Sequence, residues 1–110
     1  GARFAEVKKN RWQTVPGGLV ITSKKSGNEK EEQENYAACC CAAQNLMLYL
    51  WTKGVGVKWT TGDIIETSSF ANIVGFTTSA EKPVGMFWYG YPETIGKQIR
   101  QPLKNVLFKV

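Results

Sequence analysis

The sequence contains no histidine, and its only cysteines, Cys39, Cys40 and Cys41, stand side by side. Without histidine the chain lacks the commonest general base and metal ligand, which excludes Ser-His or Cys-His nucleophilic catalysis and histidine metal sites. Neighbouring residues on a helix point about 100° apart, so the three cysteines cannot form a tetrahedral metal site. We interpret them as small core residues of a protein in a reducing cytoplasm, and we expect no bound metal.

We expect neither a signal peptide nor a membrane-spanning run in this sequence. Arg3, Glu6, Lys8 and Lys9 stand where a signal peptide would have its apolar core. The longest uncharged apolar run, residues 35–52, contains Asn, Gln and Tyr and has no flanking basic clusters. We therefore expect a cytoplasmic protein that has no membrane partner.

The length of 110 residues suits a single domain over residues 1–110, and the hydrophobic fraction of 43% excludes a disordered chain. The net charge is +5, and residues 94–110 contain four basic residues and no acidic one. Such basic ends either contact an anionic partner, such as nucleic acid, lipid or a phosphorylated cofactor, or are simply solvated. No RNA-recognition motif or zinc-finger spacing accompanies them, so we do not expect a nucleic-acid partner.

Apolar periodicity predicts a helix, a strand and a long helix in the first half of the chain. Residues 2–9 (ARFAEVKK) predict a short helix that the polar stretch after it ends, and residues 19–22 (LVIT) predict a buried strand. The long helix is expected over residues 28–52, with Ser26 and Glu29 as a capping box. Its charged first third should be exposed to solvent.

The second half predicts two more strands with a short helical segment between them. The strands are expected at residues 55–59 and 84–89. Residues 64–76 predict the irregular helical segment, with three side chains facing inward: Phe70, Ile73 and Val74. Strands that alternate with helices predict an α+β fold in which helices cover a small sheet.

Residues 37–56, AACCCAAQNLMLYLWTKGVG, have almost no polar face, although a helix on the surface of a small protein normally has one. A helix of this kind must be covered on nearly all sides, which a chain of 110 residues cannot do alone. We therefore predict an obligate homodimer through residues 37–51. A buried charge at Ala42 or Ala43 should give insoluble or unfolded protein.

Three motifs in order carry a resemblance to a known family. They are the AxQNLxL-like segment at residues 42–48, the Gly-x-Gly at residues 54–56 with a Trp-containing loop that ends in Gly62, and the Gly-Tyr-Pro at residues 90–92. With them the chain resembles the C-terminal half to two-thirds of the flavin-dependent nitroreductase family. The family's Arg-Arg-Ser-x-Arg-like opening segment, which holds the flavin phosphate, has no counterpart here. The chain is therefore either a fragment with an incomplete fold or a degenerate member.

The resemblance implies a nitroreductase-like sandwich whose long central helix lies at the interface of a homodimer, with FMN at the same interface. Small residues at Ala37, Ala38, Ala42 and Ala43 would let the helices approach closely. The amides of Gln44 and Asn45 would then bond across the helices or to nearby backbone, or else contact flavin or substrate.

The resemblance also suggests where the cofactor binds. Thr61 and Gly62, with Trp59 and Thr60 beside them, match the loop that meets the N5–O4 edge of the flavin, where backbone N–H groups stabilise the reduced ring. Two cations in the tail, Arg100 and more weakly Lys97, match positions that contact the phosphate. The plain alternatives are an ordinary turn at the end of a strand and a solvated tail.

Other polar and aromatic residues are assigned no chemistry. We expect Asp63 and Glu66 at the surface, and Phe87, Trp88 and Tyr89 in the core, with Trp88 on the opposite face from its neighbours. The resemblance implies an FMN oxidoreductase that takes hydride from NAD(P)H and reduces a small acceptor such as a nitroaromatic or a quinone. The alternative is a truncated, non-catalytic domain for dimerisation or binding.

Overall fold

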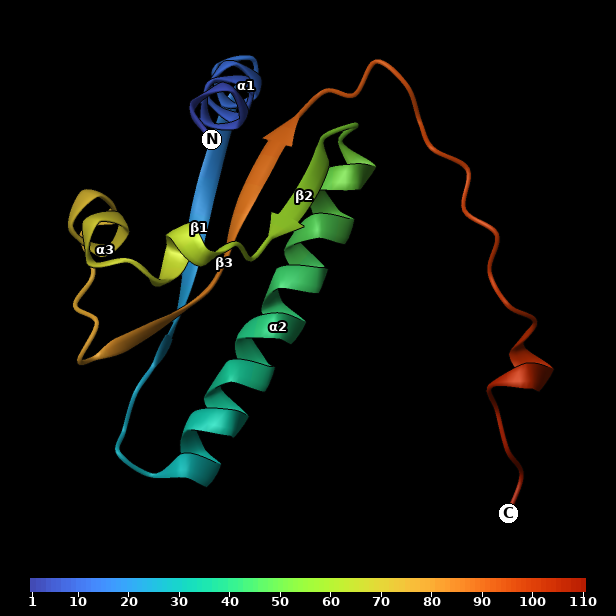
Figure 1. Cartoon of the computed structure of the whole chain (residues 1–110). Coiled ribbons are helices and arrows are strands. Elements are labelled where there is room, and N and C mark those ends of the chain that lie inside the picture. Colours follow the sequence, from blue (N-terminus) through green and yellow to red (C-terminus); the bar gives the residue numbers. More distant parts are fainter.

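The computed structural model describes all 110 residues. The elements follow in the predicted order: α1 (Ala2–Gln13), β1 (Gly17–Lys24), α2 (Glu29–Thr52), β2 (Gly56–Thr60), the 3-10 helix η1 (Asp63–Glu66), α3 (Ser68–Val74), β3 (Glu81–Gly90) and the 3-10 helix η2 (Leu103–Asn105). Figure 1 shows α2 alongside the sheet and the residues after β3 running away from the rest of the molecule. None of the helices combines the length and the apolar character that crossing a membrane requires.

The sheet has three antiparallel strands in the order β1-β3-β2. Phe87 in the central strand β3 lies opposite Leu19 of β1 and Trp59 of β2, so these three side chains share a face. Phe87 is fully buried on that face, which is the face that α2 covers, because no residue of α2 lines the cavity on the Met86 and Trp88 face. Met86 and Trp88 occupy the other face, which confirms the predicted alternation along the strand. Of the three aromatic residues expected in the core only Phe87 is buried, because Trp88 is half-buried and Tyr89 is exposed.

Helix α1 does not end at Lys9, as predicted, but continues to Gln13. Its last turn is held on the sheet by Trp12, whose ring stacks on Trp88 of β3 with centroids 5.5 Å apart and an interplanar angle of 21°. The polar residues after Lys9 have no apolar periodicity of their own, and the contact that stabilises the last turn comes from a residue 76 positions away in the chain. The local sequence could not show it.

Helix α2 begins at Glu29 with Asn28 as its N-cap, so the predicted span is confirmed but the predicted capping box of Ser26 with Glu29 is wrong. The Asn28 side chain accepts the Glu31 N–H at 3.0 Å. The Glu32 carboxylate reaches back and accepts the N–H groups of Gly27 at 2.9 Å and Ser26 at 2.8 Å. These two backbone bonds hold the pKa of Glu32 below its ordinary value.

In a single chain α2 is covered on one side only. Ala43 is fully buried against the sheet, whereas the opposite side of the helix is exposed: Ala37, Ala38, Cys41, Ala42, Asn45, Leu48 and Tyr49. Cys39 and Cys40 are half-buried, but Cys41 is exposed, so its assignment to the core is wrong for one chain. The Gln44 and Asn45 side chains are also exposed and bond to no backbone group.

The helical segment after β2 forms as predicted but buries different residues. Ile73 is 85% exposed and Val74 is also exposed, so two of the three side chains expected to face inward do not. Ile65 of η1 and Ala71 of α3 are buried instead, and Phe70 meets Phe76 edge to face at 6.3 Å. Helix α3 has only seven residues before Gly75 ends it in the left-handed conformation, so a single position, Ala71, is fully buried.

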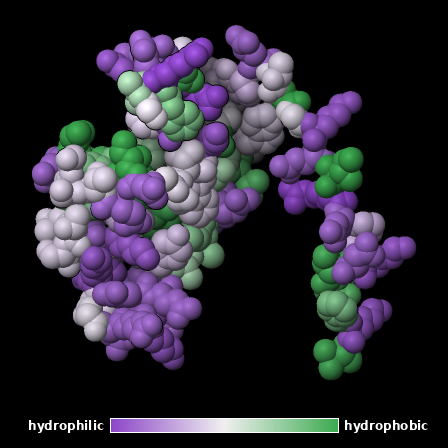
Figure 2. Space-filling view, viewed as in Figure 1, coloured by the Kyte–Doolittle hydropathy of each residue, from purple (hydrophilic) through white to green (hydrophobic).

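Residues 91–110, here called the arm, make no hydrogen bond with the body of the molecule; their only backbone bonds lie within residues 102–107. Figures 1 and 2 show the arm standing apart from the body along most of its length. Its apolar side chains are in water: Ile99 is 100% exposed and Phe108 is 86% exposed. Exposed apolar side chains at this density are typical of a segment that docks on another surface.

Candidate functional site

A groove of about 820 Å³ lies on the face of the sheet opposite α2, between α1 on one side and η1 and α3 on the other. Its floor is formed by Met86 and Trp88 of β3 with Lys58 and Thr60 of β2. These residues come together because side chains of one parity along neighbouring antiparallel strands point to the same face. The groove is of a size suited to a cofactor or small substrate.

The turn after β2 forms one end of this groove, where Thr60 and Gly62 line it. Thr61 and Gly62 are exposed, and neither backbone N–H donates a hydrogen bond to another group of the chain. A Cβ built on Gly62 would meet no atom within 4 Å, so the space above the turn is open. Two adjacent free donors below open space fit the edge of a flavin ring.

Trp59 has a different role from its neighbours in the turn. Its indole N–H donates to the Val84 carbonyl oxygen at 3.1 Å, and its ring lies 5.0 Å from that of Phe87 at a tilt of 33°. These contacts place it on the α2 face of the sheet, whereas the groove is on the opposite face. Trp59 therefore anchors β2 to β3, and Thr60, whose hydroxyl donates to the Met86 carbonyl at 2.9 Å, is the strand residue that faces the groove.

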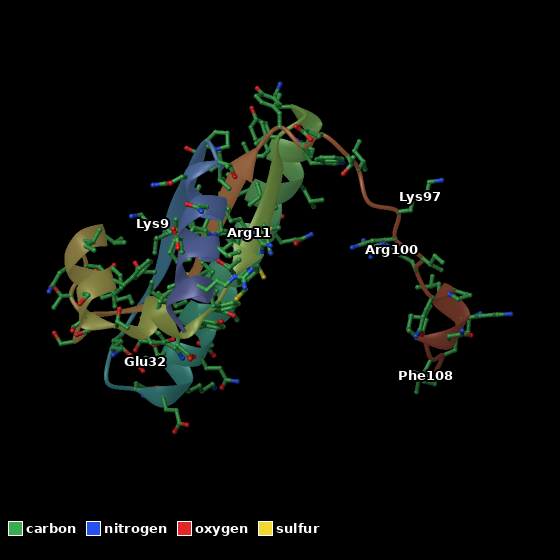
Figure 3. The ribbon with its side chains drawn as sticks, turned by 45° about the horizontal axis from the view of Figure 1, so that its top comes forward. Lys9, Arg11, Glu32, Lys97, Arg100 and Phe108 are labelled. Carbon is green, nitrogen blue, oxygen red and sulfur yellow. The ribbon has the colours of Figure 1, made fainter.

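The two predicted cations do not reach the turn within one chain. Figure 3 shows Lys97 and Arg100 on the arm, well separated from the sheet. Lys97 lines a second cavity of about 630 Å³ between the base of the arm and the C-terminal half of α2, and none of residues 59–62 belongs to that cavity. Arg100 is exposed and belongs to neither cavity. A single chain thus has free N–H groups at Thr61 and Gly62 that could meet a flavin ring, but its predicted phosphate-binding cations do not lie beside them.

The residues at the other end of the groove were not among those predicted from the sequence. Lys8, Arg11 and Trp12 line it from α1, beside Trp88. Lys8 and Arg11 are three residues apart, and this spacing puts both on one side of a helix. The predicted helix ended at residue 9, so Arg11 lay outside it and the spacing could not be used. Asp63 and Glu66 are exposed, as expected.

Comparisons with known proteins agree on one family. A family model described as "Nitroreductase family" matches residues 2–91. A crystal structure of the nitroreductase-like family protein from Bacillus cereus superposes with a TM-score of 0.85 at 24% sequence identity, and the match covers 99% of this chain and 58% of that chain. This chain therefore spans less than two thirds of that protein's length. No curated protein matches it significantly.

Proposed function

Because the chain belongs to the nitroreductase family and has its α+β fold, we propose that it is an FMN-dependent oxidoreductase, or the flavin-binding portion of one. It takes hydride from NAD(P)H in the cytoplasm and reduces a small acceptor such as a nitroaromatic or a quinone. The observation that carries the proposal is the turn at Thr61 and Gly62, with two unpaired N–H donors under open space. Hydride transfer is the chemistry that a bound flavin supplies.

The residues of this chain would bind and orient the cofactor. The N–H groups of Thr61 and Gly62 would donate to the edge of the ring, where negative charge develops on reduction. Arg100 and Lys97 would neutralise the phosphate. Since these cations lie on the arm and away from the turn of their own chain, they would have to come from a second copy.

We therefore propose a homodimer in which two α2 helices pack through residues 37–51 and each arm lies on the partner. Two features of the single chain support this arrangement. The exposed side of α2 consists mainly of small and apolar residues, which permit close approach of helices. The arm exposes apolar side chains to water and makes no backbone hydrogen bond with the body of its own chain. Covering these side chains would contribute a free energy of about 25 cal/mol for each Å² removed from water.

Flavin uptake tests the proposal. Purified protein is incubated with FMN, free flavin is removed by gel filtration, and the absorbance spectrum of the protein fraction is recorded. We expect retained flavin, followed by oxidation of NADH or NADPH when a nitroaromatic or quinone acceptor is added. Protein that stays colourless after incubation would overturn the flavin assignment.

A second candidate function is a non-catalytic domain that uses α2 and the arm for dimerisation or for binding a partner. The observation that favours it is the separation of Lys97 and Arg100 from the turn. Catalysis distinguishes the two readings, since flavin-dependent oxidation of NAD(P)H by the 110-residue chain would exclude a purely structural role.

A further inference from the structure

We propose that Trp59 is a positioning residue for the turn at Thr61 and Gly62 and thereby sets part of the reduction potential of the bound flavin. The inference rests on the proposed flavin function, in which the N–H groups of the turn donate to the edge of the ring. The Trp59 side chain lies on the α2 face of the sheet, away from the groove. It therefore acts through the backbone that carries the two donors, not by contact with the flavin.

The hydrogen bond of the Trp59 indole is made at an irregular point of the sheet. The register of β1 with β3 shifts between Ile21 and Thr22 and leaves Val84 without a partner. The pairing of β2 with β3 extends only to Met86, so Val84 has no partner there either. Val84 is buried, and its carbonyl oxygen accepts the indole N–H at 3.1 Å. Because a buried acceptor that loses its donor is costly, the bulge holds the indole in place.

The ring of Trp59 is also fixed by packing. Its centroid lies 5.0 Å from that of Phe87, which is fully buried. A Cβ built on Gly85 would overlap the indole, so the missing side chain at Gly85 lets the ring reach the Val84 carbonyl. A ring that is bonded at its nitrogen and closely packed on its faces has little freedom to move.

These contacts belong to a set that holds the turn at both ends. The hydroxyl of Thr60 donates to a carbonyl oxygen of β3 at 2.9 Å on the groove side, so two consecutive residues bond to β3 from opposite faces. After the turn, the Gly62 carbonyl accepts the N–H of Ile65, which is buried. Thr61 and Gly62 are themselves exposed. The anchors on either side therefore determine where the two free N–H groups point.

The orientation of the two donors matters because a flavin gains negative charge at this edge when it is reduced. Fixed N–H dipoles aimed at the developing charge need no reorganisation and stabilise the reduced state more than the oxidised state. Contacts that bind both states equally leave the reduction potential unchanged. Loss of the Trp59 anchor should therefore weaken the binding of reduced FMN more than that of oxidised FMN, which makes the potential more negative.

Trp59→Phe tests this role, because it keeps an aromatic ring beside Phe87 and removes the indole N–H. The affinity for oxidised FMN is measured by titration, and the potential of bound FMN by equilibration with reference dyes. We expect reduced FMN to be weakened at least about tenfold more than oxidised FMN, which corresponds to a potential about 30 mV more negative for a two-electron couple. Gly85→Ala, which displaces the indole without removing its N–H, should shift the potential in the same direction.

Leu19→Ala is the matched control. Leu19 lies on the same face of the sheet as Trp59 but on β1, on the other side of Phe87. Its truncation should lower the thermal stability and leave the potential unchanged. Circular dichroism checks that each variant is folded.

A second measurement needs no flavin. NMR relaxation of the Thr61 and Gly62 amides in the cofactor-free protein should give order parameters near about 0.85 in the wild type and below about 0.6 in Trp59→Phe. An unchanged potential in a folded, flavin-binding Trp59→Phe protein overturns the proposal, as do unchanged order parameters. Wild-type protein that holds no FMN would overturn the flavin function and the effect on potential together, which is a different result from unchanged values in a protein that binds flavin.

Discussion

Gly85 and Gly62 are both glycines close to the proposed flavin turn, but their surroundings differ. A Cβ on Gly85 would clash with the indole of Trp59 and would lie 3.1 Å from the Thr60 carbonyl oxygen, whereas a Cβ on Gly62 would meet open space. Gly85 therefore permits the close packing that anchors β2 to β3. Gly62 has no such packing role within the chain.

Gly85→Ala should lower the free energy of unfolding by about 1–3 kcal/mol, because the indole must move and its bond to Val84 is strained or lost. Gly96→Ala, at a position in the arm where a Cβ would meet no atom within 4 Å, is the control and should stay within about 0.5 kcal/mol of wild type. Urea unfolding followed by tryptophan fluorescence measures both. Equal stability of the two variants would contradict the packing assigned to Gly85.

Gly62→Val should leave stability within about 1 kcal/mol of wild type, because Gly62 is exposed and has an ordinary φ of −98°. Its FMN affinity should nevertheless fall at least about tenfold, since the side chain would occupy the space proposed for the ring. Thermal unfolding and flavin titration separate the two effects. Undiminished affinity in a stable Gly62→Val protein would place the flavin elsewhere.

At the scale of elements, local patterns were sufficient to place α2 and the strands, although β1 and β3 are each four residues longer than predicted, but not for α1 or the arm. Caps, an acidic first turn and a long apolar run lie within α2 itself, so its span could be predicted. The last turn of α1 depends on Trp12 stacking on Trp88, and the inward residues of α3 depend on which side meets the sheet. The groove end at Lys8, Arg11 and Lys58 was missed for the same reason, since it exists only when α1 lies on the sheet.

The start of α2 should make stability depend on pH. Hydrogen bonds from Gly27 and Ser26 lower the pKa of Glu32 from the ordinary value of 4.5. A carboxylate with a depressed pKa in the folded state stabilises the fold above its unfolded pKa, and this contribution is lost as the pH falls through the folded pKa. Glu32→Gln should therefore be less stable than wild type at neutral pH and should lose less stability on acidification below pH 4.5.

Glu34→Gln provides the control, because the Glu34 side chain accepts no hydrogen bond and lies two residues further into α2. Chemical denaturation at neutral and acidic pH measures the stability of both variants. If Glu32→Gln and Glu34→Gln had the same pH dependence, the backbone bonds of Glu32 would not contribute to the stability of the fold.

At the scale of the whole molecule, the apolar helix that the sequence made conspicuous has two different sides. Ala43 is fully buried against the sheet and Ala42 is exposed on the proposed dimer face. The sequence predicted the same outcome for a charge at either alanine, but the structure separates them: Ala43→Glu should unfold the chain by burying an unpaired charge, whereas Ala42→Glu should keep the fold and yield a monomer. Circular dichroism and light scattering distinguish these outcomes. A folded Ala42→Glu protein that remained a dimer would show that another surface forms the interface.

Mixing two defective variants tests most directly the central claim, that the flavin turn of one chain meets the arm cations of another. Gly62→Val supplies an intact arm, and the double variant Lys97→Ala, Arg100→Ala supplies an intact turn. Neither should bind FMN alone. After unfolding and refolding together, random pairing should restore about one quarter of the wild-type number of FMN sites, because half of the chains enter mixed dimers with one intact site each. A mixture that binds no FMN, while the wild type binds it, would contradict the shared site.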